Sequence, residues 1–166
     1  MTTLCCFCNA IITPEKSPGE PINHGVCTPC YNRIYSEFGL NVKKFLNMMD
    51  APVFLVDGKA NILEANTHAL KITGKSSHQV RGVVCGRVLD CINACLHEGC
   101  GKTENCPECV IRNAINSTYG TGEPVNNARA IVRRSEDIRN KDITVRVSTK
   151  KAGEIILLML EPFESP

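Results

Sequence analysis

The chain has 166 residues, a length typical of one domain or of a domain with a small added module. Its formal net charge of +2 gives no argument for general binding to nucleic acid. Eleven cysteines are the most unusual feature of the composition.

The N-terminus, Met1-Thr2-Thr3-Leu4, lacks the basic and apolar regions of a signal peptide. No segment approaches the roughly 18 apolar residues of a membrane helix. We therefore expect a cytoplasmic protein. Disulfides are rare in that compartment, so clustered cysteines indicate metal binding or redox chemistry.

Residues 1–39 form the first predicted unit, which we expect to be zinc-ribbon-like. It contains two C-x-x-C pairs, Cys5/Cys8 and Cys27/Cys30, with 18 residues between them. Paired thiols at this spacing are typical of a four-cysteine zinc site. So short a segment cannot bury a core of its own, and a metal would staple it. Cys6 and His24 stay open as alternative ligands.

This first unit resembles a small zinc-binding module found beside sensor domains in bacterial and archaeal signalling proteins. The mark of that module is C-x-x-C followed by H-G-[IV]-C-x-x-C. The matching residues here are Cys5-Cys6-Phe7-Cys8 and His24-Gly25-Val26-Cys27-Thr28-Pro29-Cys30.

Residues 40–50 have the apolar spacing of an amphipathic helix. Next, two apolar runs flank Asp57-Gly58, which is a strong hairpin signal. Asn66 is placed to cap a short helix that ends at Gly74. Ser76 and Gln79 have the spacing of a capping box at the start of another helix.

Residues 41–162 resemble a PAS domain, a sensor domain that opens with a helix and a hairpin. The resemblance rests on Pro52, Val53, Phe54, Leu55, Val56, Asp57, Ile62, Leu63, Ala65, Asn66 and Gly74. It implies an α+β fold over residues 40–166, with a five-stranded antiparallel sheet and flanking short helices.

A cysteine-rich insert spans residues 85–109 of this predicted domain. Its thiols Cys91, Cys100, Cys106 and Cys109 are separated by eight, five and two residues. Grouped thiolates are soft ligands that suit an iron–sulfur cluster or zinc. Both alternatives stay open, as do unliganded thiols, and Cys95 could replace Cys91. Cys6 and Cys85 receive no ligand role.

The insert resembles a PAS subgroup marked by C-x-[HN]-A, G-C-G-x-T and C-x-x-C. The matches are Cys91-Ile92-Asn93-Ala94, Gly99-Cys100-Gly101-Lys102-Thr103 and Cys106-Pro107-Glu108-Cys109. This resemblance implies a sensor that depends on redox state or on a metal.

A helix is predicted to start at Cys106–Cys109, with Pro107 in its first turn, and to stop at Gly120. Three strands are predicted after it, at 128–134, 143–148 and 155–160. The last is a continuous apolar run, which predicts a central strand covered on both faces.

We find no catalytic motif and expect a protein that is not an enzyme. The prediction is a cytoplasmic PAS sensor that signals to a separate protein partner, such as a kinase or regulator. It binds neither membrane nor nucleic acid, and a homodimer stays open. The alternatives are a zinc-binding adaptor or transcription cofactor and a small iron–sulfur electron carrier.

Overall fold

The structure of the protein is a computed structural model that describes residues 2–13, 22–37, 41–134 and 142–163. Within residues 22–37, the side chains of residues 23, 31 and 34–37 are not described. The chain forms two compact units, Met1–Asn41 and Val42–Pro166. Parts of both predicted units, such as 14–21 and 135–141, lie outside the described residues.

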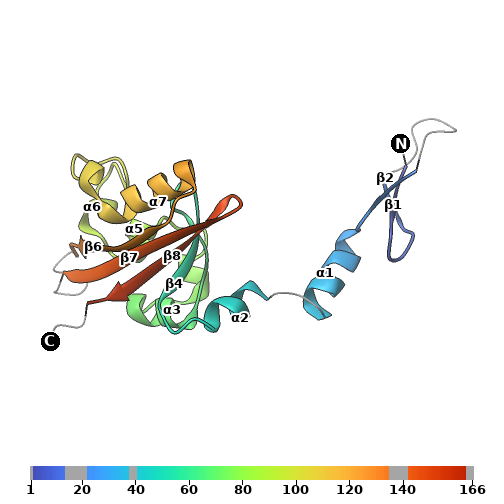
Figure 1. Ribbon diagram of the computed structural model, residues 1–166, viewed down its shortest axis with the longest axis horizontal. Coiled ribbons are helices and arrows are strands. Elements are labelled where there is room, and N and C mark those ends of the chain that lie inside the picture. Colours follow the sequence, from blue (N-terminus) through green and yellow to red (C-terminus); the bar gives the residue numbers. More distant parts are fainter. Residues whose placement is uncertain (1, 14–21, 38–40, 135–141, 164–166) are drawn as a thin grey trace. The chain divides into compact units, whose positions relative to one another are not determined.

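The first unit is a small three-stranded sheet followed by one helix (Figure 1). Strand β1 (Thr3–Cys5) lies in the middle, antiparallel to β2 (Ile11–Thr13) and parallel to β3 (Asn23–Gly25). Helix α1 (Thr28–Glu37) comes after the sheet. Cys5 is the one fully buried apolar side chain among those described in this unit, so the unit has almost no core.

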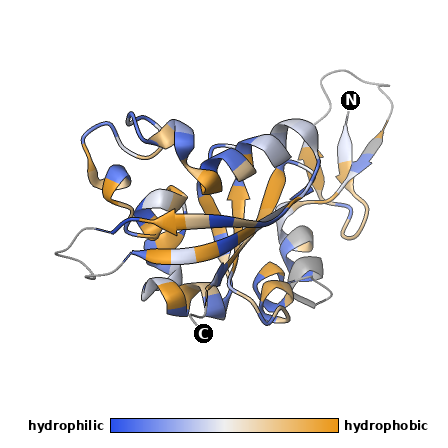
Figure 2. Cartoon of the chain, turned by 60° about the vertical axis from the view of Figure 1, so that its left-hand side comes forward, coloured by the Kyte–Doolittle hydropathy of each residue, from blue (hydrophilic) through white to orange (hydrophobic). Residues whose placement is uncertain are grey.

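The second unit is built on a five-stranded antiparallel sheet with the order β5-β4-β8-β7-β6. Its strands are β4 (Val53–Asp57), β5 (Ile62–Ala65), β6 (Val125–Val132), β7 (Ile143–Ala152) and β8 (Ile155–Pro162). The predicted α+β class and the five-stranded antiparallel sheet are confirmed. In Figure 2 these strands are predominantly hydrophobic.

Most of the helices of the second unit are short. They are α2 (Val42–Asn47), α3 (Thr67–Thr73), α4 (Ser77–Val80), α5 (Cys85–Val88), α6 (Ile92–Cys95), the 3₁₀ turn η1 (Cys106–Glu108) and α7 (Val110–Thr121). Helix α7 packs on β6, β7 and β8, and α5 and α6 lie on the same side of the sheet (Figure 1). All these elements sit between β5 and β6 in the sequence, apart from α2.

Asn66 fixes the start of α3 as the sequence predicts. Its side-chain oxygen accepts a hydrogen bond from the Ala69 N–H at 2.9 Å, which is the geometry of an N-cap. At the other end, Gly74 adopts a left-handed conformation with φ of 65° and closes the helix. The two predicted ends of this helix are therefore confirmed.

Four details differ from the sequence prediction. The first helix is shorter than predicted and spans only Val42–Asn47. The long helix starts at Val110 rather than in the C-P-x-C pair, because Cys109 has extended backbone angles that end η1. That helix runs past Gly120 to a left-handed Gly122. Strand β8 alternates between buried and partly exposed residues, since the described residues cover only one face of the sheet.

One hydrophobic core fills the second unit between the sheet and its helices. The largest fully buried side chains in it include Phe54, Ile62, Ile115, Leu158 and Leu160. None of the helices in the described part of the chain has the length and apolar character needed to cross a membrane.

Candidate metal and thiol sites

The first candidate site joins both predicted C-x-x-C pairs of the first unit. The sulfur atoms of Cys5, Cys8, Cys27 and Cys30 all lie within 4.8 Å of one another. Parallel pairing of β1 with β3 places Cys5 opposite Gly25. A tight turn after Cys5 brings Cys8 back beside it. The other pair spans the start of α1. This four-cysteine group can bind a metal ion.

The geometry of this group fits one tetrahedral ion. Around zinc, a metal–sulfur bond of about 2.3 Å places the sulfurs about 3.8 Å apart, and the sulfurs of Cys8 and Cys27 are 3.6 Å apart. Hydrogen bonds from backbone N–H groups lower the pKa of Cys5 to about 6, and the N–H of Cys27 makes the largest contribution. Neighbouring thiols raise the pKa of Cys30 to about 12, and the thiol of Cys8 makes the largest contribution. A bound cation would offset this repulsion and favour four thiolates.

The second candidate site is a cavity of about 1030 Å³ in the second unit. Five cysteines line it, and we call it the thiol cavity: Cys85, Cys91, Cys100, Cys106 and Cys109. All four thiols of the predicted insert site therefore face one space. Cys95 is exposed and is not among the lining residues.

Cys106 has the clearest environment of a thiolate. Its sulfur accepts a hydrogen bond from the Gly101 N–H at 3.1 Å and lies 3.1 Å from the Thr103 hydroxyl. Burial opposes ionisation, but these donors and the Lys102 N–H outweigh it and lower the pKa of Cys106. Gly101 reaches this position with φ of 88°, a conformation that favours glycine.

Cys85 is buried and Cys100 is partly buried. A Cβ on Gly86 would lie 2.6 Å from the Cys100 sulfur, so only glycine permits this close approach. Burial raises the pKa of Cys100, although the Arg112 guanidinium acts in the opposite direction. Cys85 is only 5% exposed. Burial is the main cause that raises the pKa of its thiol well above the usual range, and the nearby Cys100 adds to the effect.

The thiol cavity differs from the first site in how its sulfurs are spaced. All eleven cysteines lie in the described part of the chain, and the N-terminal four are the only Cys, His, Asp or Glu group there that converges for a single ion. The cavity thiols surround a space rather than one point. That arrangement suits a centre of several atoms, such as a cluster in which each iron takes one thiolate.

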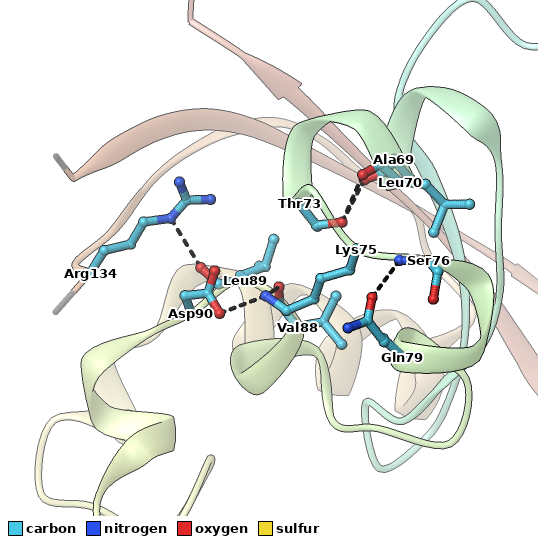
Figure 3. A network of polar contacts seen from close by, with 10 residues as sticks. All are labelled: Ala69, Leu70, Thr73, Lys75, Ser76, Gln79, Val88, Leu89, Asp90 and Arg134. Carbon is cyan, nitrogen blue, oxygen red and sulfur yellow. Dashed lines mark hydrogen bonds and ion pairs between the residues drawn. The ribbon is translucent and has the colours of Figure 1, made fainter. Parts of the chain in front are cut away.

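The segment between Cys85 and Cys91 is held by polar contacts at residues 88–90 (Figure 3). Lys75 donates to the Val88 carbonyl at 2.8 Å and pairs with Asp90 at 2.5 Å. Arg134, just after β6, donates to the Leu89 carbonyl at 3.1 Å. The next turn continues this connection, since the Ile92 N–H donates to the Arg133 carbonyl at 2.8 Å. The thiol-bearing segment is thus hydrogen-bonded to the end of β6.

Two residues at this site, Cys85 and Arg112, carry no signal in the sequence that assigns them a role. Cys85 lies in a largely apolar stretch, which indicates core packing, and no spacing rule links it to Cys100. Arg112 is separated from Gly101 by the whole of η1, yet its guanidinium lies against that glycine. Only the fold brings these groups to the cavity.

The comparisons with known proteins support a PAS-type fold for the second unit. Residues 41–108 match the family model described as a PAS domain. The match covers the α2–η1 part, and the structure adds β6, β7 and β8 to complete the sheet. None of the curated proteins matches this sequence.

Three solved structures illustrate the likeness in fold. A LOV protein of Rhodobacter sphaeroides is 14% identical with a TM-score of 0.52, over 74% of this chain and 64% of that one. This chain therefore spans less than two thirds of that relative. The PAS domain of the RpfR quorum-sensing receptor of Cronobacter turicensis, in complex with BDSF, is 13% identical. The match covers 70% of this chain and 96% of that one, with a TM-score of 0.51. The PAS domain of nitrogen regulation protein NR(II) of Vibrio parahaemolyticus is 11% identical, over 74% of this chain and 98% of that one, with a TM-score of 0.51.

Proposed function

We propose that this chain is a cytoplasmic signal-sensing protein whose input site is the thiol cavity. The cavity would hold an iron–sulfur cluster, and the first unit would hold a structural zinc ion. A change in the oxidation state or integrity of the cluster would alter the PAS unit and be read by a separate protein partner. The observation that carries this proposal is the convergence of five cysteines on one cavity of a PAS-type fold.

The residues that line the cavity fit such a centre. Thiolates supply soft ligands for iron, and hydrogen bonds to the Cys106 sulfur are of the kind that tune cluster potentials. Arg112 supplies positive charge beside Gly101, which offsets the negative charge of a thiolate-bound centre. When bound, the cluster would supply reversible one-electron chemistry.

A route from the cavity to the sheet supports the sensing role. The segment from Cys85 to Cys91 is tied to β6 through Arg133 and Arg134. A change of position at Cys91 would therefore act on the end of β6, an edge strand that can meet a partner. Similar PAS folds occur in a quorum-sensing receptor and in a nitrogen regulation protein, which is consistent with this role.

Metal analysis tests the proposal directly. The protein is purified anaerobically as wild type and as the Cys106→Ser/Cys109→Ser variant, and iron, zinc, acid-labile sulfide and the visible spectrum are measured. We expect iron, sulfide and colour in the wild type, their loss in the variant, and about one zinc in both. Two zinc ions with no iron would reject the cluster and favour the zinc adaptor. A reversible low-potential cluster without structural change would favour the electron carrier.

A further inference from the structure

Strand β6 forms one edge of the five-stranded sheet. Of the strands that the structure describes, β7 alone pairs with it (Figure 1). Residues 129–134, at the end of β6 and just after it, also line the thiol cavity. An edge strand carries main-chain N–H and C=O groups that can pair with another extended segment. What β6 can bind therefore depends on which of its groups point away from β7.

The cysteine-rich insert already pairs with this edge at one point. Cys91 forms an antiparallel bridge with Arg134, and the Ile92 N–H donates to the Arg133 carbonyl at 2.8 Å. The Arg133 carbonyl therefore points away from β7. The insert then turns into α6, and in the described part of the chain no main-chain hydrogen bond joins it to residues 129–132.

A hydrogen bond on the other side of β7 gives the same direction. The Thr144 carbonyl accepts from the Phe163 N–H, just after β8, at 2.9 Å. Since the main-chain groups of successive residues in an antiparallel strand point to opposite sides, those of Val145 point to β6, where Ala130 lies opposite. The main-chain groups of the residues on either side of Ala130 then point outward.

These outward positions are Arg129 and Ile131. Side chains alternate between the faces of a strand, and Ala130 and Val132 are buried on the face that the helices cover. Arg129, Ile131 and Arg133 therefore share the uncovered face. Ile131 is 59% exposed, so it lies in the open between two arginines.

The positive charge of this edge is not balanced. Arg129 lies directly opposite Arg146, and both guanidinium groups lie over the Phe163 ring, 5.6 and 5.5 Å from its centre. Like charges directly opposite each other destabilise a sheet. Arg146 pairs with Glu161 at 3.6 Å, whereas neither Arg129 nor Arg133 has an ion pair within the described residues. Carboxylates from another molecule would offset this repulsion.

An acidic polypeptide suits this edge better than a second copy of the chain. If two copies paired antiparallel about Ile131, Arg129 of each would lie opposite Arg133 of the other, which places like charges together. A nucleic acid would meet the arginines but has no main chain that pairs with a strand edge.

We propose that residues 129–131 of β6 bind an extended acidic segment of a protein partner by antiparallel strand addition. Carboxylates of that segment lie beside Arg129 and Arg133 on the uncovered face. The side chain between them points to the thiol cavity, where Ile92 and Leu96 add apolar surface. This inference deepens the proposed function by naming the chemistry of the partner, and it rests on that function only in taking the partner to be a protein.

Binding of a fluorescein-labelled peptide of alternating glutamate and valine, measured by fluorescence anisotropy with the full chain, tests the role of charge. We expect Arg129→Gln/Arg133→Gln to weaken binding at least about fivefold. The control Lys59→Gln/Lys71→Gln removes the same charge at exposed positions on other elements and should stay within about twofold. Absence of binding to the wild type, or equal weakening in both variants, overturns the proposal.

A proline at Ile131 tests the main-chain pairing. Ile131→Pro removes one outward N–H and leaves the bonds to β7, whereas Ile131→Ala removes only the side chain. We expect the proline variant to bind at least about threefold more weakly than the alanine variant. A peptide N-methylated at its glutamates, whose N–H groups face β6, should show the same loss on unaltered protein. Equal binding in both comparisons overturns strand addition.

Iron and sulfide analysis of the same samples separates this proposal from the cluster. Peptide binding without iron rejects the cluster and leaves the edge site standing, whereas iron without peptide binding rejects the edge site alone. A dimer in sedimentation that Ile131→Pro abolishes assigns the edge to a second copy and overturns the proposal. Displacement of the peptide by an equal concentration of single-stranded DNA, with steep salt dependence, assigns it to nucleic acid and also overturns it.

Discussion

The amide of Asn66 connects three segments of the second unit. It is fully buried, accepts from the Val53 and Ala69 N–H groups, and donates to the carbonyls of Leu46 and Ala51. These bonds join the end of α2, the start of β4 and the cap of α3. One side chain therefore fixes how three elements enter the fold.

Replacing Asn66 by alanine is expected to lower the free energy of unfolding by about 3 kcal/mol, because it removes a helix cap and leaves buried backbone groups without partners. Urea denaturation, followed at the unfolding transition of the second unit, measures this change in the free energy of unfolding. The control is Asn126→Ala, at an exposed position on β6, which should stay within about 0.5 kcal/mol of the wild type. Equal effects of the two variants would show that the Asn66 hydrogen bonds do not matter.

Asp57 gives a prediction about pH. Burial acts to raise its pKa, but hydrogen bonds from Asn61 and from the Lys59 N–H outweigh it and lower the pKa below the ordinary value. A lowered pKa stabilises the fold above the unfolded pKa of about 3.9, and this contribution is lost as pH falls through the folded value. The stability difference between the wild type and Asp57→Asn should therefore be constant above about pH 5 and shrink below about pH 4. A difference that grows on acidification would contradict this.

At the scale of elements, the approach of α5 to the loop before η1 depends on Gly86. A Cβ at this position would lie 2.6 Å from the Cys100 sulfur, so alanine must displace Cys100 from its place in the cavity. Gly86→Ala is expected to destabilise the second unit by about 1–3 kcal/mol and to reduce iron uptake.

Gly120→Ala is the matched control for that substitution. Gly120 lies within α7, and a Cβ there would meet no atom within 4 Å. Alanine should stabilise the helix by about 0.5–1 kcal/mol without changing iron uptake. Thermal unfolding and iron analysis of both variants check the pair. Normal uptake by Gly86→Ala would mean that the cavity does not need this close contact.

Elements whose signals are local could be predicted from the sequence. The cap at Asn66, the stop at Gly74 and the hairpin around Asp57 each depend on residues within a few positions of one another. Likewise, the paired spacing in the first unit predicted the cysteines that converge there. The end of α7 was missed by two residues, since both Gly120 and Gly122 can stop a helix and only backbone angles decide between them.

The thiol cavity shows what local patterns leave out. Its four motif cysteines were visible as spacings, but Cys85 fits none of those spacings and received no ligand role. Cys85 lies near Cys100 because α5 packs closely against Cys100 at Gly86, a contact that no local spacing predicts. Spacing also could not separate zinc from a cluster, because both accept four thiolates.

At the scale of the whole molecule, the two units gain their stability in different ways. The second has a continuous hydrophobic core. In the first, Phe7, Ile11 and Ile22 are each more than 60% exposed, so a bound metal must supply most of the folding free energy.

Chelation is therefore expected to unfold the first unit and leave the second folded. Hydrogen exchange with and without a strong chelator should show loss of protection in residues 2–13 and 22–37, and unchanged protection in β4 and β8. Cys30→Ser should reproduce the effect, whereas Cys6→Ser, at an exposed position, should not. Protection of the first unit that survives chelation would show that it folds without metal.

The central pairing of β4 with β8 has a consequence for how the protein is made. Val53 lies opposite Met159, so this contact closes a loop that includes the entire cysteine-rich insert. Pairing at such sequence separation is slow to form, because the entropy of a long loop is lost before the contact is gained. On the ribosome, β8 emerges after the other four strands of this sheet, so the β4–β8 pair cannot form before then. The five-stranded sheet is therefore completed only after the whole cysteine-rich insert has been synthesised.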